Sequence, residues 1–281
     1  MIQNQIKTII LLGLLTGLML GAGQSLGGKI GLLIGLIFAL LMNVVSYFFS
    51  DKIVLMMYHA REVDKNHVLH KMVEEIVHLA KLPIPKVYII PTNTPNAFAT
   101  GRNPKHAAVA ATEGILQVLN KEELRGVLAH EISHIKNRDI LVTTIAATIA
   151  GVISYIASMA QWAAIFGTGG NDEDKGMGHM VGLLFLAILT PIIATIIQLA
   201  ISRSREYLAD ESGAKLINDP IALANALQKI EKSVMQSPMP FGSEVTSSLF
   251  ITNPFTAKGL FTLFSTHPPT EERVARLHNL K

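Results

Sequence analysis

Four long stretches without a charged side chain restrict the fold of this 281-residue chain more than any other feature. They cover residues 8–28, 30–50, 140–170 and 176–202. Each is long enough for a transmembrane helix, which needs about 20 apolar residues. Charged residues make up 16% of the chain, below the roughly 25% typical of a soluble domain. We therefore expect membrane spans rather than buried core helices. A signal peptide is the alternative for the first stretch, but that stretch exceeds the usual apolar length and a second span follows at once.

The distribution of lysine and arginine predicts how these spans are oriented. Residues 51–139 hold 12 of the 24 basic residues and residues 202–281 hold 9. The loop between the first two spans offers only Lys29, and the loop at 171–175 is net acidic. The positive-inside rule then places both polar segments and both termini in the cytoplasm. The net charge of +3 is mild and gives no case for nucleic-acid binding.

The predicted order along the chain is a hairpin, a polar segment, a second hairpin and a second polar segment. The boundaries are 1–50 and 140–202 for the two transmembrane hairpins, and 51–139 and 203–281 for the two parts of a cytoplasmic domain.

His130, Glu131 and His134 form an HExxH pattern in the first polar segment. Two histidines four residues apart lie on one face of a helix, so both rings can reach one ion. Asn120 and Glu123 have the spacing of a capping box, which predicts a helix that starts just before this pattern. The glutamate can then act as a base beside the open metal position. The alternative, a core helix with two histidines by accident, leaves their desolvation without compensation.

The returning membrane hairpin predicts the third metal ligand. Residues just after 202 should lie at the same depth as residues just before 140, which brings Glu206 close to His134. Asp210 lies one helical turn further and is predicted to accept a hydrogen bond from a ligand histidine. The alternative is a solvated helix start in which Arg203 and Arg205 anchor the chain at the membrane surface. The chain has no cysteine, so a metal must use His, Asp or Glu.

Local patterns around this helix predict a small sheet. Apolar residues at helical spacing predict an amphipathic helix over about 59–81, and the run 86–90 predicts a strand. Residues 97–100 and 107–111 are further strand candidates. The predicted fold is a mainly α integral membrane protein, with four transmembrane helices in two hairpins and a cytoplasmic zincin-type domain that contains a small β-sheet.

With HExxH, the downstream run Arg205-Glu206-Tyr207-Leu208-Ala209-Asp210 and two apolar hairpins, the whole chain resembles the HtpX heat-shock membrane zinc metallopeptidases, which are relatives of the CAAX prenyl endopeptidases. The resemblance implies one Zn²⁺ held by His130, His134 and Glu206, with Glu131 as the base. It further implies that Asn96 and His267 steady the oxyanion of the reaction. An extended substrate would lie along the edge strand formed by Ala97, Phe98, Ala99 and Thr100.

The same resemblance implies a protease in the bacterial cytoplasmic membrane that acts on misfolded membrane proteins in quality control. Three alternatives are weighed against it. A protein with a structural zinc would need a fourth ligand, which only His267 could supply. A transporter would carry charged residues within its spans, and this chain has none there. A prenyl-protein endopeptidase would need a large chamber in the membrane, which four spans do not obviously provide.

Overall fold

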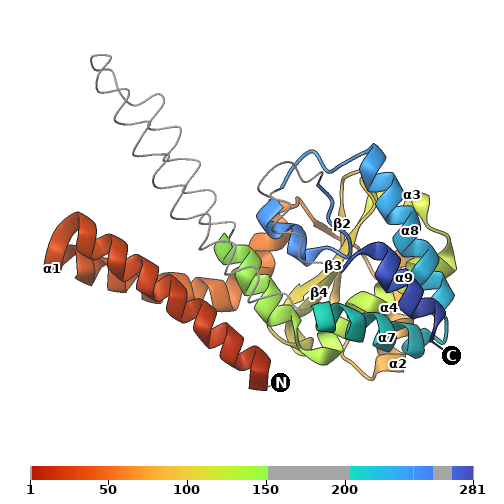
Figure 1. Ribbon diagram of the computed structural model, residues 1–281, viewed down its shortest axis with the longest axis horizontal. Helices are drawn as coiled ribbons and strands as arrows, with labels where there is room; N and C mark the ends of the chain where they lie inside the picture. Colours follow the sequence, from red (N-terminus) through yellow and green to blue (C-terminus); the bar gives the residue numbers. More distant parts are fainter. Residues whose placement is uncertain (1, 151–202, 243, 256–267, 281) are drawn as a thin grey trace, which may run out of the picture.

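The computed structural model describes residues 2–150, 203–242, 244–255 and 268–280. A long helical hairpin projects away from a globular part that contains a small sheet and several packed helices (Figure 1). Within these residues the chain is mainly helical, as predicted.

The hairpin is helix α1 (Ile2–Met57), which reverses direction near Gly28. Gly28 has φ of 55°, a conformation that glycine adopts without strain, and this allows the sharp reversal. Asn43 Nδ2 donates to Thr16 Oγ1 at 2.9 Å and joins the two arms. Both arms, Asn4–Gly21 and Gly28–Met57, are long and apolar enough to cross a membrane. They correspond to the first two predicted spans.

The outer surface of α1 is apolar. Ile9 is 69% exposed and Ile30 is 75% exposed in the isolated chain. Long rows of such side chains are unfavourable in water and favourable in lipid. The third predicted span begins with the apolar helix Ile140–Ala150. The rest of that span and the whole fourth span lie outside the described residues.

The sheet has four strands in the order β1-β2-β4-β3. Strand β2 (Lys86–Ile90) is parallel to β4 (Ala107–Thr112), which is antiparallel to β3 (Ala97–Gly101). The three predicted strands are thus confirmed, and β3 lies at one edge of the sheet. The short strand β1 (Arg61–Glu62) pairs with β2 and was not predicted.

Helix α2 (Val68–Ala80) begins later than the predicted helix over 59–81. The prediction is wrong for the first nine residues, because β1 takes residues 61–62 into the sheet. The His67 side chain then accepts a hydrogen bond from the Leu69 backbone and caps the helix.

Helix α4 (Lys121–Asn137) runs through the centre of the globular part. It packs against α2, β3 and the two helices α7 (Arg203–Ile217) and α8 (Pro220–Gln236). The remaining described elements in this part are the short helices η1 (Pro104–His106), α3 (Glu113–Val118) and η2 (Glu244–Leu249), and the last helix α9 (Thr270–His278). The large apolar cluster around α4 makes this helix a rigid support for its side chains.

Candidate metal centre

Helix α4 carries the HExxH residues and is fixed at both ends. The predicted capping box is confirmed: Asn120 and Glu123 each accept a hydrogen bond from the backbone of the other. The helix ends where Arg138 adopts a left-handed conformation with φ of 59°. The helix does not run on into the apolar segment that begins at Ile140. The chain breaks at Arg138 and Asp139, and a separate helix starts at Ile140.

Helix α7 approaches α4 closely at Gly213. A Cβ atom at this position would lie 2.8 Å from the backbone nitrogen of His130, which is too close for any side chain. The absence of a side chain therefore lets the two backbones approach each other. This close approach places Glu206 and Asp210, both on the buried side of α7, beside the histidines of α4.

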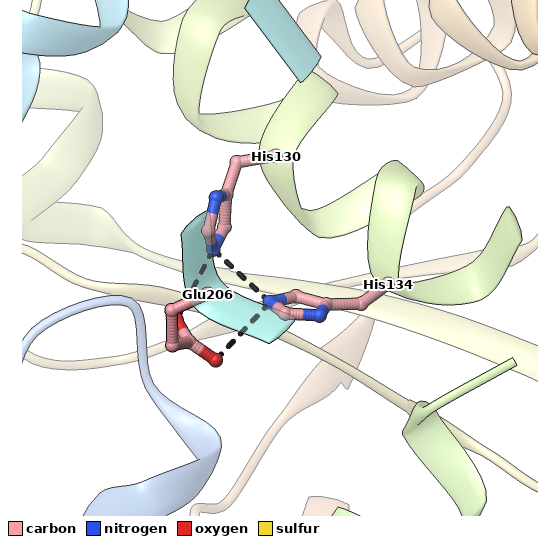
Figure 2. A group of neighbouring side chains, drawn as sticks. All are labelled: His130, His134 and Glu206. Carbon is pink, nitrogen blue, oxygen red and sulfur yellow. Dashed lines mark hydrogen bonds and ion pairs between the residues drawn. The ribbon is translucent and has the colours of Figure 1, made fainter. Parts of the chain in front are cut away.

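Two rings and one carboxylate converge on a single point. The Nε2 atoms of His130 and His134 lie 3.0 Å apart. Each Nε2 atom is 3.7 Å from an oxygen of Glu206, with a different oxygen facing each ring (Figure 2). All three ligand atoms lie within 4.8 Å of one another. The spacing suits one divalent ion between them, and these are the three residues predicted as ligands.

The far sides of both rings contact carboxylates. His130 Nδ1 lies 2.9 Å from Asp210 Oδ1, and His134 Nδ1 lies 3.1 Å from Asp139 Oδ2. A carboxylate at Nδ1 favours a proton there and leaves the Nε2 lone pair free for a metal. The Asp210 contact agrees with its predicted role. Asp139 was missed, although an aspartate just before an apolar helix and just after HExxH was visible in the sequence.

Asp210 is itself held by Arg273 of α9. The guanidinium donates to both carboxylate oxygens, from Nη2 at 2.7 Å and from Nε at 2.9 Å. Its Nη1 donates to the Ile251 carbonyl at 2.8 Å. Arg273 is 1% exposed, so this ion pair is almost fully removed from water. Sequence reasoning did not assign Arg273 a role. Thr270 is the first residue of α9 and donates to Glu231.

Burial and neighbouring charges shift the pKa values of these groups. Burial raises the pKa of Glu131 to about 8, and the Glu206 carboxylate adds to this. Burial lowers the pKa of His130. Burial acts in the same direction on His134, but the carboxylates of Asp139 and Glu206 outweigh it and raise the pKa of that ring to about 10. At neutral pH these groups therefore hold protons that a bound cation would displace.

Glu131 faces a narrow cavity shared with the ligand set. The cavity has a volume of about 20 Å³, enough for one water-sized group. Its walls come from α4, α7, β3, the start of the 140–150 helix and residues 248–251. The backbone N–H of Ala99 donates to the Glu131 carboxylate. A candidate base, three candidate ligands and an edge strand thus meet in one place.

The residues of β3 have different surroundings. Ala99 lines the cavity, whereas Phe98 is buried among the rings of Tyr58 and Phe250. Thr100 Oγ1 lies 3.0 Å from Thr144 Oγ1, and the Ala97 carbonyl accepts from the Ile251 N–H at 3.1 Å.

Of the two residues suggested to steady an oxyanion, the structure describes only Asn96. Asn96 is fully buried, its Nδ2 donates to the Thr252 carbonyl at 2.6 Å, and it is not among the described residues that line the cavity. His267 lies outside the described residues. Their catalytic roles stay predictions.

The site combines two imidazoles on one helix, a carboxylate from a second helix and a buried glutamate beside them. This set of residues is typical of a mononuclear metallopeptidase. The apolar hairpin α1 adds a membrane anchor, so fold and site together define a membrane metalloprotease. Comparison with known families agrees, since the profile of Peptidase family M48 matches residues 64–281. The chain belongs to this family.

Several similar proteins carry the name Protease HtpX homolog. The one from Persephonella marina is 54% identical over 282 residues, which cover 99% of this chain and 97% of the relative. The one from Syntrophotalea carbinolica is 59% identical over 241 residues, or 85% of each chain. Among solved structures, the crystal structure of S. mikatae Ste24p superposes with a TM-score of 0.53. The match covers 98% of this chain and 66% of the Ste24p chain. The sequence identity is 19%, so this match shows only that the two proteins have a similar fold.

Proposed function

We propose that this protein is a zinc endopeptidase of the bacterial cytoplasmic membrane that cleaves cytoplasmic regions of misfolded membrane proteins in quality control. The observation that carries the proposal is the convergence of His130, His134 and Glu206 beside Glu131 in one cavity. The positive-inside pattern supports a topology with four spans and with both termini and the active site in the cytoplasm.

The donor set fits zinc. The two Nε2 atoms and the Glu206 carboxylate would hold the ion, while Asp210 and Asp139 fix the rings from behind. Three nitrogen and oxygen ligands leave a coordination position open, as in catalytic zinc sites. When bound, zinc supplies a water of lowered pKa and polarises the scissile carbonyl.

Glu131 is placed to move the proton. Its carboxylate lies in the same cavity as the ligands and is oriented by the Ala99 N–H. Burial raises its pKa to about 8, so at neutral pH it holds a proton until the charge of a bound cation lowers that pKa. Once ionised in this way it can accept the proton of the water, and its high affinity for a proton suits the carboxyl to carry that proton to the leaving amine. A glutamate at the surface, with an ordinary low pKa, would bind the proton too weakly to carry it to the leaving amine.

The outer edge of β3 is the proposed binding surface for an extended substrate. Ala99 of this strand lines the cavity, and an extended peptide could add to the edge of the sheet beside it. The present cavity accepts one small group only, so a peptide can bind only after the cavity wall has opened. Asn96 could join the reaction only after releasing the Thr252 carbonyl.

The position of the cavity favours membrane-bound substrates. Ile140, the first residue of an apolar helix, is one of the residues that line it. The metal centre is therefore close to the level at which the chain enters the bilayer. Loops and juxtamembrane segments of other membrane proteins reach this level.

The test is to measure metal content and cleavage of an unfolded membrane protein by the intact protein and by Glu131→Gln. The variant should keep its zinc and lose cleavage by about 10²–10⁴-fold. Glu122→Gln, on the exposed side of the same helix, is the matched control and should cleave normally. A chelator should stop wild-type cleavage. Normal cleavage by Glu131→Gln, or cleavage restricted to prenylated peptides, would contradict the proposal.

A further inference from the structure

A second cavity lies where the membrane hairpin meets the globular part. Its volume is about 480 Å³, far larger than the cavity at the metal centre. Its walls come from both arms of α1, the β3–β4 connection and the break between α4 and the 140–150 helix. None of the ligand residues of the metal centre lines it, so it is a separate site.

One side of this cavity is positively charged. Arg102 and Arg138 both line it, and none of the described residues in its wall is acidic. The Arg102 guanidinium lies over the Phe48 ring, 5.0 Å from its centroid, which holds the charge in place. Arg138 is fixed through its backbone, because its carbonyl accepts from Asn4 Nδ2 at 3.1 Å.

A third arginine, Arg205, contacts Asn4, which is one of the residues that line the cavity. Arg205 Nη1 donates to Asn4 Oδ1 at 3.3 Å, and its Nη2 is buried without a hydrogen-bond partner among the described residues. Asp139 contacts His134, and the carboxylates of Asp139 and Glu206 also act on Arg205, so this third arginine is balanced from the side of the metal centre. Neither carboxylate belongs to the wall of the cavity that holds Arg102 and Arg138. The cavity therefore has an excess of positive charge that residues of its own wall do not neutralise.

Another part of the cavity wall is apolar. Ile9, Leu141 and Val142 line it, and Ile9 is 69% exposed. The first arm of α1 begins at Asn4 and the third apolar helix begins at Ile140, so the cavity lies at the level where apolar helices start. Phospholipid headgroups occupy this level of a bilayer, and basic pockets at the cytoplasmic ends of spans suit anionic ones.

We propose that this cavity binds an anionic phospholipid. Its phosphate lies between Arg102 and Arg138, where arginine can pair with phosphate oxygens through two parallel hydrogen bonds. Its acyl chains run along Ile9 and Leu141 into the membrane. A soluble phosphate compound would use only the charged side and leave the apolar side exposed. The proposal does not depend on the protease activity.

Lipid retention by the full-length protein tests this site. The wild type, Arg102→Gln/Arg138→Gln and a control, Lys105→Gln/Lys136→Gln, are purified in a neutral detergent. The control removes the same charge from exposed neighbours in sequence that do not line the cavity. Binding of phosphatidylglycerol, phosphatidylethanolamine and glycerol phosphate is then measured by native mass spectrometry. Phosphatidylglycerol should bind the wild type and control equally and the arginine variant about 30-fold more weakly.

Three results would overturn the proposal: equal phosphatidylglycerol binding by all three proteins, equal binding of the zwitterionic lipid, or saturation by glycerol phosphate alone. A photoactivatable phosphatidylglycerol on the wild type covers the case in which the arginine variant does not fold. Cross-links should fall on peptides that contain residues 4–9, 102–103 or 138–142. Cross-links found only elsewhere would refute the assignment.

Discussion

Replacing Asp210 by asparagine should damage both the fold and the metal centre. In the wild type its carboxylate receives two hydrogen bonds from Arg273 and contacts His130 Nδ1 at 2.9 Å. The Arg273 guanidinium beside it outweighs the effect of burial and holds the pKa of Asp210 at about 2, below the ordinary 3.8. That difference corresponds to about 2 kcal/mol of stability at neutral pH.

The full loss should be larger than this linkage figure. An asparagine leaves the buried Arg273 charge without its anion, and breaking such a pair costs about 3–5 kcal/mol. It also turns an amide towards His130 in place of a carboxylate. Zinc affinity should therefore fall by about 10–100-fold, which is typical for loss of a group that orients a ligand.

Denaturant unfolding of the metal-free protein and zinc titration measure the two effects. The matched control is Glu211→Gln, since Glu211 follows Asp210 on α7 but pairs with Lys215 at the surface. Its unfolding midpoint and zinc affinity should match those of the wild type. The stability that Asp210 contributes is present above pH 3.8 and is lost as the pH falls through about 2. The reasoning fails if Asp210→Asn unfolds at the wild-type midpoint, or if the difference persists unchanged at pH 2.

Three further changes test the geometry of the centre. Gly213→Ala should push α7 away from α4, destabilise the protein by about 1–3 kcal/mol and weaken zinc binding. An unchanged melting curve would show that the space between the two helices accepts a Cβ atom. Glu206→Ala should reduce the zinc content of the purified protein, and full occupancy would mean that another residue is the third ligand. Asp139→Asn should weaken zinc binding by about 10–100-fold, measured by titration against a chelator. The zinc affinity of the wild type should rise between pH 6 and 8. The pKa of His134 is about 10, so zinc must displace a proton from this ring, and that becomes easier as the pH rises. An affinity that does not change with pH would contradict this.

The sequence predicted the features that depend on local spacing. The HExxH helix, its capping box and three strands follow from neighbouring residues. Glu206 was predicted as the third ligand by a different argument. A transmembrane hairpin enters and leaves the membrane at the same surface, so the residues just before it and just after it lie at a similar depth. That argument needed only chain topology, and the convergence of the three ligand atoms agrees with it.

The features that sequence reasoning missed depend on distant contacts or on backbone conformation. The burial of Arg273 is set by Asp210, 63 residues earlier, and no local pattern indicates it. Asp139 was overlooked because its position depends on the break after α4, where Arg138 adopts a left-handed conformation that no local pattern indicates. Two-residue β1 is stabilised by pairing with β2 and has no pattern of its own.

The link from Arg273 through Asp210 to His130 also sets an order of events during synthesis. A growing chain makes the helix with both histidines first, gains Glu206 only after the intervening apolar residues, and receives Arg273 last. Until then Asp210 lacks its countercharge and the ring of His130 lacks a fixed orientation. An unfinished polypeptide therefore contains the HExxH residues before it contains the carboxylate and the guanidinium that hold His130 in place.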